Sequence, residues 1–153
     1  MNWALVPAYA YLAVVSAVLA VIDIRRHLLP NVVTLTSYPI VMVLLALPAF
    51  VDDNWGAWTR AVMASMLTLA IFTAMAVLAS GSFGMGDAKL AGVLAMPLAW
   101  SSWMHTVVAM AGAFVLSALV SVALLLSHRA TRHSLIPFGP FLIASAWMVT
   151  VLG

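Results

Sequence analysis

The sequence predicts an all-α membrane protein with about six transmembrane helices, and three observations lead to this prediction. Hydrophobic residues make up 66% of the 153 positions, only 7% of the residues are charged, and the mean hydropathy is +1.18. A soluble domain of this size would be about a quarter charged. The apolar residues extend from end to end, which excludes a single signal peptide or anchor. We therefore expect one membrane-embedded domain spanning residues 1–153.

Each predicted helix is a run of apolar residues, and a run of about 20 is long enough to cross a bilayer. In chain order the six runs are 3–22, 32–51, 61–79, 88–101, 104–126 and 136–152. Pro30 disfavours helix at the residue before it and so ends the first helix, and Asn31 is expected to cap the second. The run 88–101 is short, which favours an extension into the preceding loop or a thinned or protein-lined environment.

The charges in the short connections predict the orientation. Odd-numbered connections hold five of the six Lys and Arg residues, namely Arg25, Arg26, Lys89, Arg129 and Arg132. The even-numbered connections hold only Arg60. Because loops rich in Lys and Arg stay in the cytoplasm, the termini are expected outside. The same arrangement places every tryptophan toward the outer interface, which tryptophan favours: Trp3, Trp55, Trp58, Trp100, Trp103 and Trp147.

Composition also excludes several classes of function. The net charge is +2, but the few basic residues form no stripe, so nucleic acid is not an expected partner. The chain has no cysteine, which excludes cysteine nucleophiles and cysteine-based zinc sites. His27, His128 and His133 fall on the cytoplasmic side without the spacing of a metal site. No metal or other cofactor is expected, and membrane lipid is the expected surrounding.

Two of the four carboxylates are placed where a charge is costly. Asp52 and Asp53 belong to a polar outer connection, and we interpret them as solvated. Asp23 and Asp87 instead lie where a long apolar helix meets a cytoplasmic connection, at the same predicted depth. An acid so close to lipid indicates a functional site. The alternative is an interfacial acid paired with a neighbouring base, such as Arg25 or Lys89.

The surroundings of Asp87 favour the functional interpretation. Gly84 and Gly86 precede it and lack side chains, which leaves room for an extended substrate strand. Asp87 also opens a helix, whose N-terminal dipole stabilises a carboxylate. Two carboxyls held close together tend to share one proton, so that one can deprotonate a water while the other polarises a peptide carbonyl. Which of Asp23 and Asp87 takes which role is left open.

Three blocks of sequence resemble the type IV prepilin peptidase family, the GxGD-type aspartyl enzymes that process class III signal peptides. Residues 23–31 are similar to its catalytic Asp followed by Arg and Leu-Pro-Asn, 84–89 to its Gly-x-Gly-Asp-x-Lys motif, and 136–141 to its Pro-Phe-Gly-Pro segment. The resemblance implies that Asp23 and Asp87 are catalytic. The further motif residues, which are possible substrate contacts, are Arg25, Pro30, Asn31, Gly84, Gly86, Lys89, Pro137, Phe138, Gly139 and Pro140.

The resemblance also implies the substrate and the location. The expected partner is a prepilin-like precursor whose basic leader is cut off at the cytoplasmic face of a prokaryotic inner membrane. The chain is similar to the minimal members that lack a cysteine-rich cytoplasmic region, so methyltransferase activity is not expected. Lys89 and Arg25 can also be interpreted as topology signals whose side chains extend toward the interface. The prolines of 137–140 can also be interpreted as an ordinary helix entry.

Three alternatives remain. The first is a small proton-coupled transporter or channel that uses Asp23 and Asp87 as relay groups, although such sites usually lie near the midplane between repeated halves. The second is an intramembrane protease similar to presenilin, in which the first acid follows a tyrosine, whereas Asp23 follows Ile22. The third is a scaffold without catalysis. The particular precursor, the oligomeric state and the route of substrate entry are not predicted.

Overall fold

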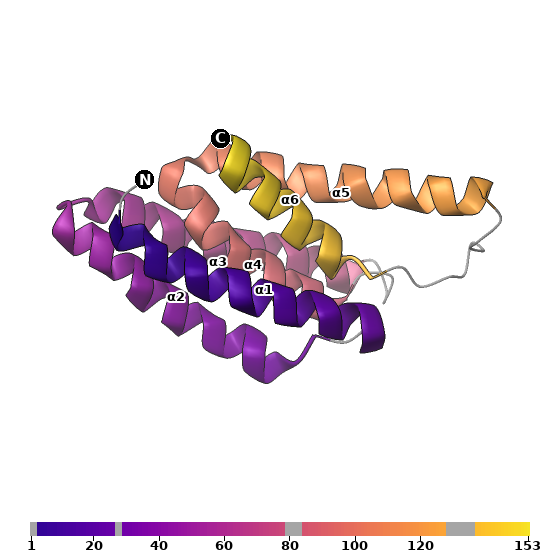
Figure 1. Cartoon of the computed structure of the whole chain (residues 1–153), viewed down its shortest axis with the longest axis horizontal. Coiled ribbons are helices and arrows are strands. Elements are labelled where there is room, and N and C mark those ends of the chain that lie inside the picture. Colours follow the sequence, from indigo (N-terminus) through magenta and orange to yellow (C-terminus); the bar gives the residue numbers. More distant parts are fainter. Residues whose placement is uncertain (1–2, 27–28, 79–83, 128–136) are drawn as a thin grey trace.

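A computed structural model of the chain describes residues 3–26, 29–78, 84–127 and 137–153, and all regular structure within them is helical. A short 3-10 helix, Trp3–Leu5, leads into the first of six α-helices (Figure 1). These are α1 (Val6–Arg26), α2 (Asn31–Val51), α3 (Trp55–Leu78), α4 (Met85–Ser101), α5 (Trp103–Leu126) and α6 (Gly139–Leu152). The prediction of an all-α chain is confirmed. The interpretations of Arg129, Arg132, His27, His128 and His133 fall outside the described residues.

The helix boundaries agree best with the predicted runs where apolar sequence ends abruptly. Helices α2 and α5 match the runs 32–51 and 104–126 to within one residue. Helix α3 begins at Trp55, six residues before the predicted start, because Asn54 accepts a hydrogen bond from the Ala57 amide at 3.2 Å and so caps the first turn. A hydropathy run does not detect such a turn.

Four of the helical segments are long and apolar enough to cross a membrane: Trp3–Arg26, Asn31–Val51, Trp55–Leu78 and Trp103–Leu126. Helix α6 is apolar but has only 14 residues. The chain is therefore a multi-pass membrane protein by the length and composition of its helices. That α4 and α6 also span, giving six, stays a prediction.

Helix α4 forms the centre of the bundle. Every residue from Leu90 to Trp100 is buried, and the helix packs against α2, α3, α5 and α6. Its most extensive contact is with α3, where small residues of both helices, such as Ala61 and Ala91, are buried. Small side chains let helix backbones approach closely inside a membrane. The short fourth helix is thus lined by protein, and it also extends three residues into the loop that the sequence places before it.

Arg60 holds the C-terminal end of α4. Its Nε donates to the carbonyl of Ala99 at 2.6 Å, and its guanidinium also donates to the carbonyls of Trp100 and Ser101. The last carbonyls of a helix have no partner within the helix, and a cation there also interacts favourably with the helix dipole. Arg60 therefore has a structural role that its count as a loop charge did not reveal.

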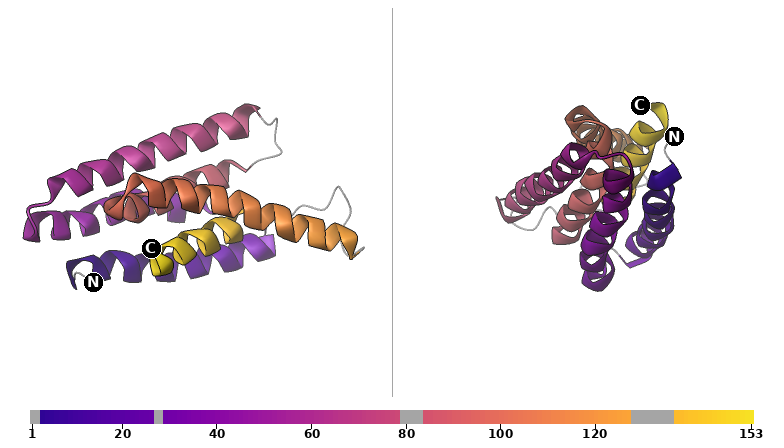
Figure 2. Two further views of the ribbon diagram at one scale, coloured as in Figure 1. Left: turned by 90° about the horizontal axis from the view of Figure 1, so that it is seen from above. Right: turned by 90° about the vertical axis from the view of Figure 1, so that its left-hand side faces the viewer.

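The helices run alternately up and down the bundle. The start of α1 and the end of α6 lie at one end, as the views in Figures 1 and 2 agree. The opposite end holds the last turn of α1 and the first turns of α4 and α6. The described residues of all three predicted motif blocks therefore lie at this end, opposite the start of α1 and the end of α6.

Candidate active site

Asp23 belongs to the core-facing stripe of α1. The buried residues of this helix recur every three or four positions, at Ala8, Leu12, Ser16, Leu19 and Asp23. This helical period places the Asp23 carboxyl on the inner face of α1, where the residue is only 5% exposed. Arg25 and Arg26 are exposed beyond it. The sequence thus forces a carboxyl into the interior one turn before α1 ends.

Asp87 enters the same region from α4. It is the third residue of the helix and is partly buried, and its amide donates to the Gly84 carbonyl at 3.1 Å. The first amides of a helix point along its axis and favour a carboxylate beside them. Asp87 lies in the first turn of the helix, as the sequence predicts.

Gly139 brings the two acids together. It is the first residue of α6, and a Cβ atom on it would lie 2.5 Å from Asp23 Oδ2 and 3.4 Å from Asp87 Oδ1. These two carboxyl oxygens are therefore no farther apart than the two distances together, which is roughly the span that one water bridges with two hydrogen bonds of about 2.8 Å each. Any side chain at position 139 would collide with Asp23. Three stretches far apart in sequence thus form one site.

A pocket of about 290 Å³ opens onto this pair. Its lining consists of both acids, Leu29, Asn31 and the three residues Gly84, Met85 and Gly86. Both carboxyls therefore line one pocket. Leu29 and Met85 were missed as site residues by sequence reasoning, because an apolar side chain inside a motif carries no chemical signal of its own.

The two glycines before Asp87 have more specific roles than the sequence suggested. A Cβ on Gly86 would lie 2.9 Å from the Cβ of Leu29, so the space beside Gly86 is filled by Leu29. A Cβ on Gly84 would lie 3.0 Å from Asp87 Oδ2. Gly86 therefore allows α4 to pack against the 29–31 segment, and Gly84 leaves space for the Asp87 carboxyl. Both still line the pocket.

Asn31 does not cap α2, which corrects the sequence prediction. Pro30 occupies the N-cap position, no side chain caps the helix, and Asn31 is its first residue. The Asn31 side-chain oxygen instead accepts a hydrogen bond from Lys89 Nζ at 2.7 Å. The first and second motif blocks are thus joined directly, and Lys89 has a partner inside the protein as well as a charge near the interface.

The remaining predicted residues surround the pair without joining it. Arg25 and Pro30 line a neighbouring cavity of about 500 Å³. Phe138 packs its ring 4.9 Å from that of Phe114, centroid to centroid, and thereby fixes the entry of α6. Pro140 lies at the start of α6, which agrees with an ordinary helix entry, and Pro137 is partly buried just before it.

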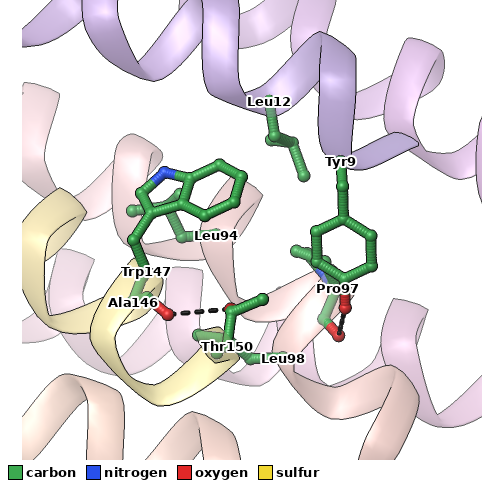
Figure 3. A pocket seen from close by; sticks show the side chains of 8 residues that line it. All are labelled: Tyr9, Leu12, Leu94, Pro97, Leu98, Ala146, Trp147 and Thr150. Atoms are coloured by element: carbon green, nitrogen blue, oxygen red, sulfur yellow. Dashed lines mark hydrogen bonds between the residues drawn. The ribbon is translucent and has the colours of Figure 1, made fainter. Parts of the chain in front are cut away.

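A further cavity, at the other end of the bundle, has no carboxyl in its lining. It is lined by residues of α1, α4 and α6, including Tyr9, Pro97 and Trp147 (Figure 3). Its volume of about 10 Å³ is about what one water needs. The Tyr9 hydroxyl donates to the Pro97 carbonyl at 3.3 Å. No group of three His, Asp or Glu residues suited to a metal occurs in the described ranges.

Comparison with known proteins identifies the family of the chain. A profile of the Type IV leader peptidase family matches residues 10–152. The chain is also 25% identical over 135 residues to the prepilin leader peptidase/N-methyltransferase of Stutzerimonas stutzeri. That match covers 88% of this chain and 46% of the relative, so the chain spans about half the relative's length. No solved structure matches the chain. With nearly its whole length inside the profile, the chain belongs to the type IV leader peptidase family.

Proposed function

We propose that the protein is an intramembrane aspartyl endopeptidase that cuts the basic leader from prepilin-like precursors at the cytoplasmic border of the inner membrane. The observation that carries this proposal is the convergence of Asp23 and Asp87 at Gly139. Family membership supports the substrate class, since the relative is named a prepilin leader peptidase. The pocket beside the pair supports access of a peptide to both acids.

The proposed chemistry needs one proton between the two acids. Asp23 is buried and Asp87 partly buried, so two negative charges at this separation are unfavourable, and the pair holds one proton. The ionised carboxylate removes a proton from a water, and the protonated carboxyl donates a hydrogen bond to the scissile carbonyl. The water oxygen then attacks the carbonyl carbon. As the peptide bond breaks, the leaving amine takes up a proton and the pair is restored to its single proton.

The location of cleavage follows from the position of the pair. Asp23 and Asp87 lie at the end of the bundle that holds Arg25, Arg26 and Lys89. Short segments rich in Lys and Arg stay in the cytoplasm, so this end is assigned to the cytoplasmic border. A precursor in the same membrane then presents the junction of its polar leader and its apolar helix at the depth of the pair.

Single Asp→Asn substitutions test the proposal. Asp23→Asn and Asp87→Asn keep the shape of each side chain but remove its acid–base function, so each is expected to lower leader cleavage by at least about a hundredfold, the lower end for a general acid or base. The measurement is the mobility shift of a pilin precursor reconstituted with the purified protein in proteoliposomes. Unchanged processing by either variant would refute the pair.

Asp53→Asn is the matched control. Asp53 is exposed, far from the site, and has a φ of 49°, a conformation that asparagine adopts readily. The substitution removes one carboxylate outside the pocket and is expected to leave processing of the precursor intact. Mass spectrometry of the cleaved product reports separately whether its new N-terminus is methylated. Methyl transfer is part of the relative's name and not of this proposal.

A further inference from the structure

Two side chains of α2 converge on a single residue of α4. The Tyr38 hydroxyl donates to the backbone carbonyl of Lys89 at 2.7 Å, and the Asn31 side-chain oxygen accepts from the Lys89 ammonium, also at 2.7 Å. Asn31 and Tyr38 are seven residues apart and so lie on the same face of α2. Lys89 is therefore held through its main chain and through its side chain by the same helix.

Gly92 makes the Tyr38 contact possible. A Cβ atom on Gly92 would overlap the Tyr38 hydroxyl, so only a glycine lets the phenol reach the backbone of α4. The carbonyl of Gly92 accepts a hydrogen bond from Ser65 at 2.8 Å, which holds the other side of the same turn. The absence of a side chain at Gly92 thus permits the hydrogen bond between Tyr38 of α2 and the backbone of α4.

The first turn of α4 needs such a restraint. It begins after Gly84, which provides no side-chain cap, and it contains Gly86. The first four amides of a helix have no partner within the helix, and glycine weakens a helix relative to alanine, so this turn is prone to fray. Asp87 sits in this turn, two residues before Lys89. A displacement of the turn would carry the Asp87 carboxyl away from Asp23.

We propose that Tyr38, admitted by Gly92, is a positioning residue that holds the first turn of α4 and thereby orients Asp87 toward Asp23. Tyr38 reaches the pair only through the backbone of Lys89 and does not line the pocket. The part of this inference that concerns catalysis rests on the function proposed above. The part that concerns the turn does not.

A matched pair of tyrosines tests the inference. Tyr38→Phe and Tyr9→Phe each remove one phenol hydroxyl that donates to a backbone carbonyl of α4. Tyr38 does so at the site end, and Tyr9 at the far end, where Figure 3 shows its contact with Pro97. Amide hydrogen exchange in lipid nanodiscs is measured along α4. Tyr38→Phe is expected to speed amide exchange in the first turns of α4 roughly three- to tenfold, which corresponds to the free energy of one hydrogen bond. Tyr9→Phe is expected to leave the exchange of these turns unchanged. Equal exchange in both variants would overturn the inference.

Kinetics provide the readout that a merely structural role would not change. Tyr38→Phe is expected to lower kcat roughly three- to tenfold with KM nearly constant, because the pocket is intact and only the orientation of Asp87 is lost. Tyr9→Phe is expected to leave both constants unchanged. A change in exchange without a change in kcat would contradict the positioning role. If the native protein fails to cleave any precursor, the proposed function fails, and the exchange data alone decide whether Tyr38 holds the turn.

Gly92→Ala is a second way to break the hydrogen bond between Tyr38 and the Lys89 carbonyl. The added methyl displaces the hydroxyl without altering Tyr38 itself, so it is expected to reproduce the faster exchange of the first turn. A Cβ atom at position 92 would also lie 3.1 Å from Leu69 Cβ, a contact that stays when Tyr38 is replaced. In the Tyr38→Phe background only the displacement of the hydroxyl is removed, so Gly92→Ala is expected to add less than it does alone. Fully additive effects would contradict a shared contact.

Discussion

At the scale of single residues, the site depends on the absence of side chains as much as on the acids. Asp23 is buried because it continues the inward stripe of α1, and Asp87 reaches it because Gly139 leaves the space between them open. A carboxyl in an apolar bundle is costly, and such a residue therefore indicates a functional site. The short distances at Gly139 explain why a glycine opens α6 directly after Phe138.

Gly139→Ala is expected to abolish most activity without unfolding the protein. Its methyl would lie 2.5 Å from Asp23 Oδ2, and displacing a reacting group by about 1 Å costs on the order of a hundredfold in rate. Alanine favours helix more than glycine does, so the backbone of α6 is not weakened. The control is Gly56→Ala, where the nearest neighbour would be 4.0 Å away. Equal cleavage rates in the two variants would show that the contact at Gly139 is unimportant.

The candidate site was predictable in its acids but not in its supporting contacts. Asp23 and Asp87 stand out because a charge beside lipid is rare, and that signal is local. The contact at Gly139 joins residues more than fifty positions apart, and the sequence gives no measure of such proximity. Asn31 was assigned as a cap because asparagine favours that position. In the fold Pro30 occupies the cap position, and the Asn31 side chain is bonded to Lys89.

At the scale of elements, α4 is the helix that links the site to the rest of the bundle. This helix is short and buried along most of its length, so lipid does not fix its position, and polar contacts at its ends do so instead. Arg60 holds its last carbonyls, and Tyr38 holds the carbonyl of Lys89, directly after its first turn. A hydropathy run identifies such a helix but cannot reveal how it is held. The early start of α3 at Trp55 was missed for a related reason, because its first turn depends on a cap.

Arg60→Met tests the hold at the far end of α4. Methionine keeps much of the side-chain volume but donates no hydrogen bond, so the carbonyls of Ala99 to Ser101 lose their charged partner. The free energy of unfolding is expected to fall by about 1.5–3 kcal/mol, as for hydrogen bonds to a charged group. Thermal unfolding in detergent measures it. Arg26→Met, at an exposed arginine, is the control, and an equal loss there would contradict the role of Arg60.

At the scale of the whole molecule, antiparallel helices separate the end that holds Asp23 and Asp87 from an end rich in tryptophan. Both termini and the 52–54 turn lie at the second end. The number of α-helices in the described residues was predictable because each lies in an apolar run, although α4 and α6 are shorter than a span requires. The charges of the connections predict which end faces the cytoplasm.

Labelling of single cysteines tests this orientation, and the chain has no native cysteine to interfere. Asp53→Cys and Met85→Cys place thiols at exposed positions near the two ends. A maleimide that cannot cross membranes is expected to label the first only from the outside and the second only from the cytoplasmic side of oriented vesicles. The reverse pattern would invert the assigned topology. If both thiols are labelled from the same side, the chain does not cross the membrane an odd number of times between the two positions.

The most direct test of the central claim measures whether the two acids meet. In an otherwise cysteine-free chain, the Asp23→Cys/Asp87→Cys double variant is treated with the shortest thiol-specific bifunctional reagents, and Asp53→Cys/Asp87→Cys serves as the control pair from opposite ends of the bundle. We expect efficient intramolecular cross-linking of the first pair and none of the second. If the first pair reacts only with long reagents, or not at all, Asp23 and Asp87 do not share a water, and the proposed chemistry cannot occur.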